Sequence, residues 1–429
     1  MLIEFSVGNY LSIKDRQTLR LDASSISEYK DQLIDAGRYQ LLRSAVIYGA
    51  NASGKSNVLK AIATMRRIVL SSAQRSSAAE IEVEPFLLST ETENAPSYFE
   101  IIFLLKNIRY RYGFEVDQKA VRSEWLFELK KKQEKPLFLR EEDGIDVSKN
   151  FKEGQDIEDK TRNNALFLAI CDQFNGSISK QIMAWFTSLM SLSGLHHENY
   201  AMLLSRFFAV EDIKDTVMNL IKMVDLGFTG IEVESGANSE KLLNALRLNG
   251  REDVVDLVEN QLTKSIKTIH HKYDSEQKLV GEVLFDFHTN ESEGTKKFLD
   301  IIVVLCVSLM TGKCVLADEL DAKLHPLMTQ AIIRLFNDPV TNPNNAQLIF
   351  ATHDTNLLAQ GGFRRDQIYF TEKDQYGATC LYSLVEYQEQ NGDKVRKDRS
   401  FEKDYIQGRY GAIPFIGDLS KLVPAWHEK

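Results

Sequence analysis

The chain is poor in the residues that mark disordered, disulfide-rich or metal-binding proteins. Its 429 residues include 8 prolines and 23 glycines. Together these make about 7% of the chain, against roughly 12% in average proteins, which excludes a disordered or collagen-like chain. The four cysteines are scattered without a C-x-x-C pair. Neither a zinc site nor a disulfide framework is predicted, and three of the cysteines lie in apolar surroundings typical of reduced core thiols.

Long apolar runs and excess positive charge are also missing. The longest apolar run, residues 301–310, is too short for a bilayer, which needs about 20 residues. The N-terminus lacks the basic segment and apolar stretch of a signal peptide, so a cytoplasmic location is expected. Lysine and arginine total 52 against 61 acidic residues, a net charge of −9. This balance disfavours general coating of nucleic acid but leaves a local basic groove open.

The pattern along the chain predicts an α/β protein in three parts. Residues 1–150 begin with two short strands and later show an antiparallel meander over 97–140. Residues 151–280 are predicted to form a mainly helical insertion, although neither apolar stripe in it is long enough for a coiled-coil arm. In residues 281–429 strands and helices alternate, which predicts a parallel sheet.

A strand, a glycine-rich turn and a helix follow one another over residues 44–69. The turn, residues 49–56, matches the phosphate-loop pattern G-x-x-x-x-G-K-[ST] in full. Glycine at its tight points lets the backbone N–H groups turn inward on phosphates, and the helix that begins near Lys55 adds its positive dipole end. Lys55 is predicted to reach the β- and γ-phosphates and the Ser56 hydroxyl to bind Mg²⁺. The predicted nucleotide-binding residues of this turn are Gly49, Asn51, Gly54, Lys55, Ser56 and Asn57.

An apolar strand over residues 314–317 ends in two carboxylates, Asp318 and Glu319. Taken alone, an Asp-Glu pair after a strand is usually a solvated strand end. Together with the phosphate loop it predicts a catalytic pair. Asp318 is expected to hold Mg²⁺, directly or through water, and Glu319 to orient and deprotonate the attacking water.

His353 follows the next apolar strand, residues 347–351. A lone histidine is more often structural than catalytic. This one lies one strand–helix unit after Asp318, so it should emerge at the same edge of the sheet, where ligands bind in open parallel sheets. We predict that His353 senses the γ-phosphate.

Residues 291–295, Glu-Ser-Glu-Gly-Thr, precede a buried helix predicted over 298–310. A Ser-x-Gly at a helix start offers a hydroxyl, free N–H groups and a positive dipole end. It is an anion site to which its own chain supplies no anion. Ser292 and Gly294 are therefore candidate ligands of a γ-phosphate held by a second protomer, and the alternative is an ordinary helix cap.

With these four elements in this order, the chain resembles the ABC-type ATPases of the SMC/RecF/OLD branch. More narrowly, it is similar to the compact prokaryotic family that includes RloA, the abortive-infection AbiL ATPase and the ATPase of the PARIS anti-phage system. The signature lacks the Leu-Ser-Gly-Gly-Gln form of transporters, and Gln74 is only a weak candidate for the glutamine lid loop. The stretches that carry the resemblance are residues 5–15, 54–57, 292–295, 318–321, 325–326, 364–368 and 408–414.

The resemblance implies a two-lobed ATPase head that uses ATP and Mg²⁺. Two chains would sandwich ATP, the phosphate loop of one facing Ser292 and Gly294 of the other, as a dimer or a larger assembly. The implied role is that of a sensor or scaffold in an anti-phage abortive-infection system. It would act through a separately encoded effector nuclease of the TOPRIM type, since residues 354–429 carry no Asp-x-Asp pair. A phage-derived trigger and DNA are further candidate partners.

The main alternative is a RecF-like ATPase of DNA repair. That function predicts a basic stripe across paired heads and DNA binding that weakens steeply with salt. The acidic total and the lack of a long arm favour the defence role. The motor of an ABC transporter is disfavoured by the form of the signature, and a small-molecule kinase has no use for Ser292 or His353.

Overall fold

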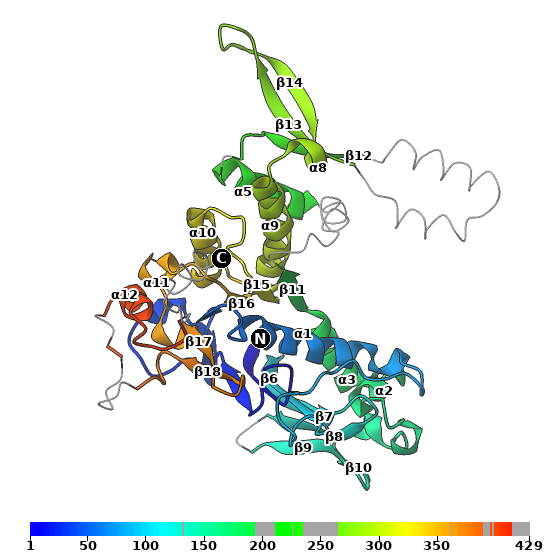
Figure 1. Ribbon diagram of the computed structural model, residues 1–429. Coiled ribbons are helices and arrows are strands. Elements are labelled where there is room, and N and C mark those ends of the chain that lie inside the picture. Colours follow the sequence, from blue (N-terminus) through cyan, green and yellow to red (C-terminus); the bar gives the residue numbers. More distant parts are fainter. Residues whose placement is uncertain are drawn as a thin grey trace, which may run out of the picture.

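The computed structural model describes residues 1–130, 133–193, 211–224, 226–234, 265–360, 362–388, 395–396 and 399–413. Within these residues the strands form two large sheets, a three-stranded sheet and a hairpin of β3 (Ile34–Ala36) with β4 (Tyr39–Leu41). Figure 1 shows α1 (Lys55–Ser71) between the two large sheets and a β-hairpin projecting from the body. None of the described helices is long and apolar enough to span a bilayer.

One large sheet carries the predicted parallel strands. Its strands, in spatial order, are β11 (Leu189–Ser193), β15 (Cys314–Asp318), β16 (Gln347–Ala351), β5 (Ser44–Gly49), β17 (Ile368–Lys373) and β18 (Thr379–Ser383). All neighbours are parallel except β17 and β18. Every residue of β5 and β16 is buried, as expected for parallel strands that are covered on both faces. The α/β fold class is confirmed.

The other large sheet is antiparallel and includes the predicted meander. Its spatial order is β10 (Gly144–Val147), β9 (Lys135–Glu141), β8 (Val121–Leu129), β7 (Ile108–Val116), β6 (Ser97–Leu105), β1 (Leu2–Gly8) and β2 (Gln17–Arg20). In β7 the side chains of Tyr110, Tyr112, Phe114 and Val116 are buried, as expected where one face of a sheet meets the core.

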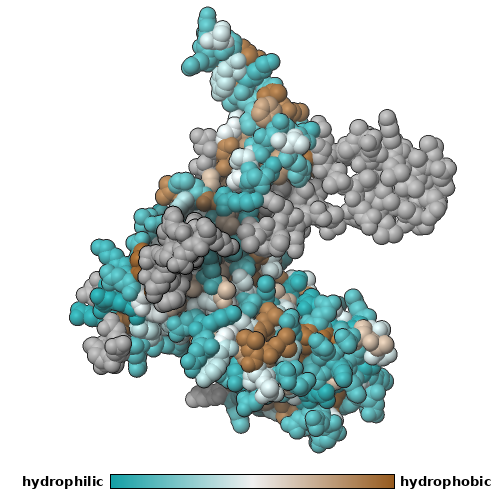
Figure 2. Space-filling view, viewed as in Figure 1, coloured by the Kyte–Doolittle hydropathy of each residue, from teal (hydrophilic) through white to brown (hydrophobic). Residues whose placement is uncertain are grey.

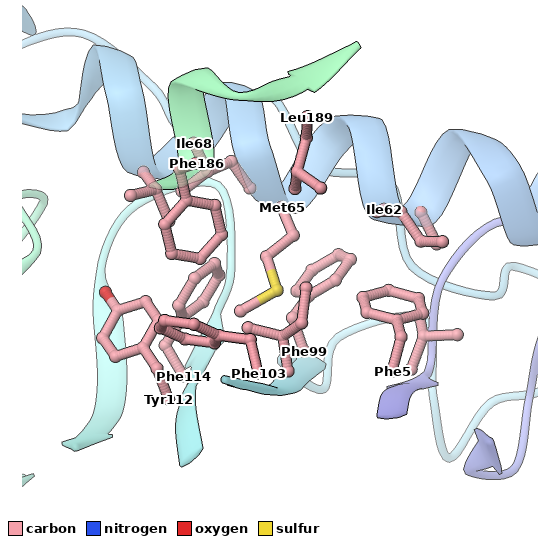
Figure 3. Packing of buried hydrophobic residues seen from close by; sticks show 14 of the residues in the cluster. Phe5, Ile62, Met65, Ile68, Phe99, Phe103, Tyr112, Phe114, Phe186 and Leu189 are labelled. Atoms are coloured by element: carbon pink, nitrogen blue, oxygen red, sulfur yellow. The ribbon is translucent and has the colours of Figure 1, made fainter. Parts of the chain in front are cut away.

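The main core lies where α1 packs on the antiparallel sheet. Figure 3 shows Met65 of α1 among the rings of Phe99, Phe103 and Phe114 from the sheet. Two further helices, α2 (Phe167–Gln173) and α3 (Ser177–Thr187), close this core. The ring of Trp185 in α3 stacks on that of Phe103 with 4.0 Å between centroids. Buried aromatic side chains of this size contribute strongly to stability because they remove so much apolar surface from water.

The opposite face of the parallel sheet is covered by further helices. They are α9 (Glu293–Thr311), α10 (Pro326–Asn337), α11 (Asn356–Gln360) and α12 (Phe401–Ile406). Their apolar side chains form a second core with the sheet. Short 3₁₀ turns occur at Lys30–Gln32, Ser72–Gln74, Lys152–Gly154, Glu158–Lys160 and Arg365–Gln367. Cys171, Cys306 and Cys314 are buried and Cys380 is exposed, all four unpaired.

The range 151–280 is not one mainly helical unit in its described parts. α2 and α3 belong to the core of the N-terminal sheet, and β11 joins the parallel sheet. The rest includes α5 (Glu211–Val224), β12 (Gly230–Glu234), β13 (Ser265–Tyr273) and the start of β14 (Leu279–Asp286). The short helix α8 (Phe287–Asn290) follows directly after this range. Short strands with mixed alternation are not separable from helix by periodicity alone, which is why this division was missed.

The projecting hairpin, β13 with β14, is rooted on α9 through one apolar cluster. This cluster includes Ile266 of β13, Phe287 of α8 and Phe298 of α9. Beyond the root, β14 is exposed along most of its length, and Figure 2 shows apolar side chains between polar ones on this projection. The hairpin therefore extends from the helix whose first residues carry the Ser-x-Gly sequence.

Candidate active site

A cavity of about 680 Å³ lies at the carboxyl edge of the parallel sheet. The strands β5, β15 and β16 are parallel neighbours or next neighbours, so their carboxyl ends meet at this edge. The cavity is lined by residues 51–57, Glu319, His353 and Lys373. The structure thus brings together the phosphate loop, the expected catalytic carboxylate and the expected sensor histidine.

Two glycines of the phosphate loop have no room for a side chain. Gly54 has a φ of 108°, and a Cβ on it would lie 2.2 Å from the Oγ1 of Thr379. A Cβ on Gly49 would lie 2.4 Å from the Oγ of Ser53. The loop therefore requires glycine both for its backbone conformation and for its close approach to the strands beneath it.

The side chain of Lys55 is held within the loop. Its Nζ donates hydrogen bonds to the carbonyl oxygens of Gly49, at 2.8 Å, and Ala50, at 3.0 Å. Burial lowers the pKa of Lys55 below its ordinary value, and nearby carboxylates, that of Asp318 first, oppose the shift. A phosphate brought to this buried ammonium would provide a strong charge-assisted partner.

Ser56 and Asp318 meet directly. The Ser56 Oγ donates a hydrogen bond of 3.0 Å to Oδ1 of Asp318. A hydroxyl and a carboxylate are hard oxygen ligands of the kind that Mg²⁺ takes together with substrate phosphates and water. The pair therefore fits the magnesium role predicted from the sequence.

The loop after β15 is joined to the end of β16. The Leu320 N–H donates to the carbonyl oxygen of Ala351, at 3.3 Å. The His353 N–H donates to Oδ2 of Asp321, at 3.4 Å. Glu319, directly before Leu320, has a φ of 52°, a conformation rare for residues other than glycine and often found at functional sites. These bonds hold Glu319 and His353 at the same cavity.

Hydrogen bonds join the phosphate loop and the start of α1 to side chains of β17, of β18 and of the loop at Ser12. The Oγ of Ser53 lies 2.7 Å from Oγ1 of Thr371, and the Oγ1 of Thr379 donates to the Ser53 carbonyl oxygen at 3.0 Å. The Nδ2 of Asn57 donates to the Ser12 Oγ at 2.7 Å, and that oxygen also lies 2.8 Å from Oγ1 of Thr379. Thr371 and Thr379 belong to no motif and were not predicted as site residues. Ser12 lies in the stretch 5–15 that carries the family resemblance, but no role at the phosphate loop was predicted for it.

Ser292 and Gly294 do not line this cavity. Ser292 caps α9, its Oγ accepting a hydrogen bond from the Thr295 N–H at 3.1 Å, and it is exposed. Gly294 lies against the loop after β15, since a Cβ on it would be 3.2 Å from the Lys323 carbonyl oxygen. The signature therefore lies near the carboxyl edge of the sheet but outside the cavity of its own chain.

Glu293, between Ser292 and Gly294, is paired with two lysines. Its carboxylate lies 3.1 Å from the Nζ of Lys296 and 3.2 Å from that of Lys323. These hydrogen-bonded ammonium groups lower the pKa of Glu293 to about 2. The two lysines therefore neutralise this carboxylate. An unpaired carboxylate would oppose the positive end of α9 and repel an incoming anion, and the pairing weakens both effects.

Gln74 does not lie near the cavity. It ends the 3₁₀ turn Ser72–Gln74, which follows the whole length of α1. A helix rises about 1.5 Å per residue, so the 17 residues of α1 carry Gln74 roughly 25 Å from the phosphate loop. The weak assignment of Gln74 to the lid loop is wrong on this geometry. Lys373, by contrast, lines the cavity and was not singled out in the sequence.

Comparison with known families decides the class of the protein. Residues 44–359, well over half of the chain, match the family described as "AAA domain, putative AbiEii toxin, Type IV TA system". The chain belongs to this family. As an AAA-domain protein it is an ATPase of the P-loop class, and the matched range includes every predicted site residue.

Among solved structures, the chain is similar to the SMC head domain from Thermotoga maritima. The two share 13% sequence identity with a TM-score of 0.39, and the match covers 89% of this chain and 98% of that one. No protein with a curated description matches the AAA-domain chain.

Proposed function

We propose that the chain binds Mg²⁺–ATP in the cavity and hydrolyses it in a sandwich formed with a second copy of itself. The observation that carries the proposal is the position of Ser292. It begins a 19-residue helix whose N-terminus is exposed and outside its own cavity. Such a helix end binds anions, and in a symmetric pair each helix end can face the cavity of the other copy.

The residues of the cavity suit the steps of hydrolysis. Lys55 and the N-terminal end of α1 bind the phosphates, and Ser56 with Asp318 would hold Mg²⁺, which neutralises negative charge on the phosphates when bound. Glu319 accepts a proton from the attacking water, and His353 contacts the γ-phosphate from the next strand. Ser292 and Gly294 of the second copy would complete the ring of donors around the γ-phosphate.

We further propose that the ATPase is a sensor or scaffold of a prokaryotic anti-phage system and controls a separately encoded effector nuclease. The family description supports this direction, because it names an abortive-infection toxin and a type IV toxin–antitoxin system. The ATP-dependent joining of two copies would provide the switch. Hydrolysis would then separate the two copies and restore the unpaired, inactive state.

The rate of ATP hydrolysis per chain tests the shared site. If two copies complete each site, the specific rate should rise with chain concentration and level off once pairing is complete. Steady-state phosphate release, measured over a hundredfold dilution series at saturating Mg²⁺–ATP, gives this curve. A specific rate that stays constant down to concentrations where light scattering detects only single chains contradicts the proposal.

A further inference from the structure

Among the described residues that line the cavity, Lys373 is the one that neither the phosphate loop nor the predicted catalytic set explains. It ends β17, which pairs in parallel with β5 so that Thr371 lies opposite Gly49. Two residues further on, Lys373 therefore lies beside the phosphate loop, past the end of β5. It is exposed, and none of the ion pairs among the described residues includes it.

The alternation of side chains along β17 directs Lys373 toward the loop. Side chains two residues apart in a strand share a face, and Thr371 contacts Ser53 of the phosphate loop from that face. Glu372, between them, points to the opposite side, where its carboxylate accepts a hydrogen bond from the Ala412 N–H. Lys373 thus projects on the side of the sheet where the nucleotide would bind.

The order of strands places Lys373 away from the reacting end of the nucleotide. In the sequence β15, β16, β5, β17, Glu319 and His353 follow the first two strands, and Lys373 ends the last. Neighbouring strands are about 4.8 Å apart, so β15 and β17 are separated by roughly 14 Å with the phosphate loop between them. With the γ-phosphate on the Glu319 side, the α-phosphate and the nucleoside extend toward β17.

We propose that Lys373 is a second phosphate-binding cation of the site and contacts the nucleotide on its α-phosphate side. An ammonium there offsets the negative charge that Asp318 and Glu319 add to the cavity. Because this contact involves a part of the nucleotide that hydrolysis leaves in place, it stabilises the ground state and the transition state equally. The inference rests on the proposed nucleotide-binding function.

The test is the affinity of the Lys373→Met variant for ATP and ADP, measured by calorimetry on the full chain with Mg²⁺. Loss of one charge-assisted contact should raise the Kd for both nucleotides by about tenfold and by the same factor. The turnover number at saturating ATP should stay within about twofold of the original chain. Lys135→Met, which removes an exposed lysine at the start of β9, is the matched control and should change neither Kd.

Each other outcome overturns the inference. A loss confined to ATP would place Lys373 at the γ-phosphate, and unchanged affinities would show that the side chain faces solvent. Lys373→Arg should retain most of the affinity if charge is what matters, and a loss as large as that in Lys373→Met contradicts the charge argument. The unchanged chain serves as the reference for the proposed function itself, because if it binds neither nucleotide the function is wrong, whatever Lys373 does.

Discussion

Glu319→Gln should bind ATP with nearly unchanged affinity but hydrolyse it at least about 100-fold more slowly, since removal of a general base typically costs a factor of 10² to 10⁴. The amide has the same shape as the carboxylate and can occupy the same backbone conformation, yet it cannot accept the proton of the attacking water. Single-turnover hydrolysis and nucleotide binding, measured on the same preparation, separate the two effects.

The same variant should accumulate as a closed pair of chains in ATP, because hydrolysis is the step that opens the sandwich. Light scattering with and without ATP measures this shift. Glu142→Gln, an exposed carboxylate outside the cavity, should hydrolyse and dissociate as the unchanged chain does. Unchanged turnover in Glu319→Gln would refute the assignment of the base.

Lys55→Ala should lose nucleotide binding, with the Kd for ATP raised by about 100-fold or more. The substitution removes the buried ammonium of the phosphate loop, and hydrogen bonds to charged groups contribute about 1.5–3 kcal/mol each. It also leaves the carbonyl oxygens of Gly49 and Ala50 without their donor, so a small fall in Tm is expected as well. Calorimetric titration with Mg²⁺–ATP is the measurement.

Lys60→Ala is the matched control for Lys55→Ala, because Lys60 lies on the same helix and is exposed. Its affinity for ATP should not change. Under the proposed anti-phage role, Lys55→Ala should abolish protection against phage in cells while Lys60→Ala retains it. Full protection with Lys55→Ala would contradict the proposal that ATP binding drives the proposed defence role.

The elements built from contiguous patterns were predictable. The strand–loop–helix at the phosphate loop, the meander, and the strands that end at Asp318 and Ala351 depend on local periodicity and on a motif with fixed spacing. The sequence also predicted that Glu319 and His353 lie near the phosphate loop, because the carboxyl ends of parallel strands lie at one edge of the sheet. The structure places these groups at one cavity.

The parts that were missed depend on which strands become neighbours. Nothing in the sequence around Thr371 or Lys373 shows that β17 lies beside β5, so their places under and beside the phosphate loop appear only in the sheet order. The division of residues 151–280 was missed for a related reason. The apolar faces of α2 and α3 predict burial, but they do not tell which core receives them.

The central claim is that each reaction centre takes groups from two copies of the chain, and mixing two inactive variants tests it most directly. Lys55→Ala keeps its signature but lacks a working phosphate loop, and Ser292→Arg keeps its loop but carries a bulky side chain at the signature. Each alone should hydrolyse ATP at a small fraction of the original rate.

An equal mixture should recover up to about a quarter of the original rate, since random pairing gives half mixed pairs and each of these contains one complete site of two. Phosphate release from the mixture, compared with the sum of the two variants assayed separately, is the measurement. Full activity of Ser292→Arg alone, or a mixture no faster than that sum, would contradict the shared site.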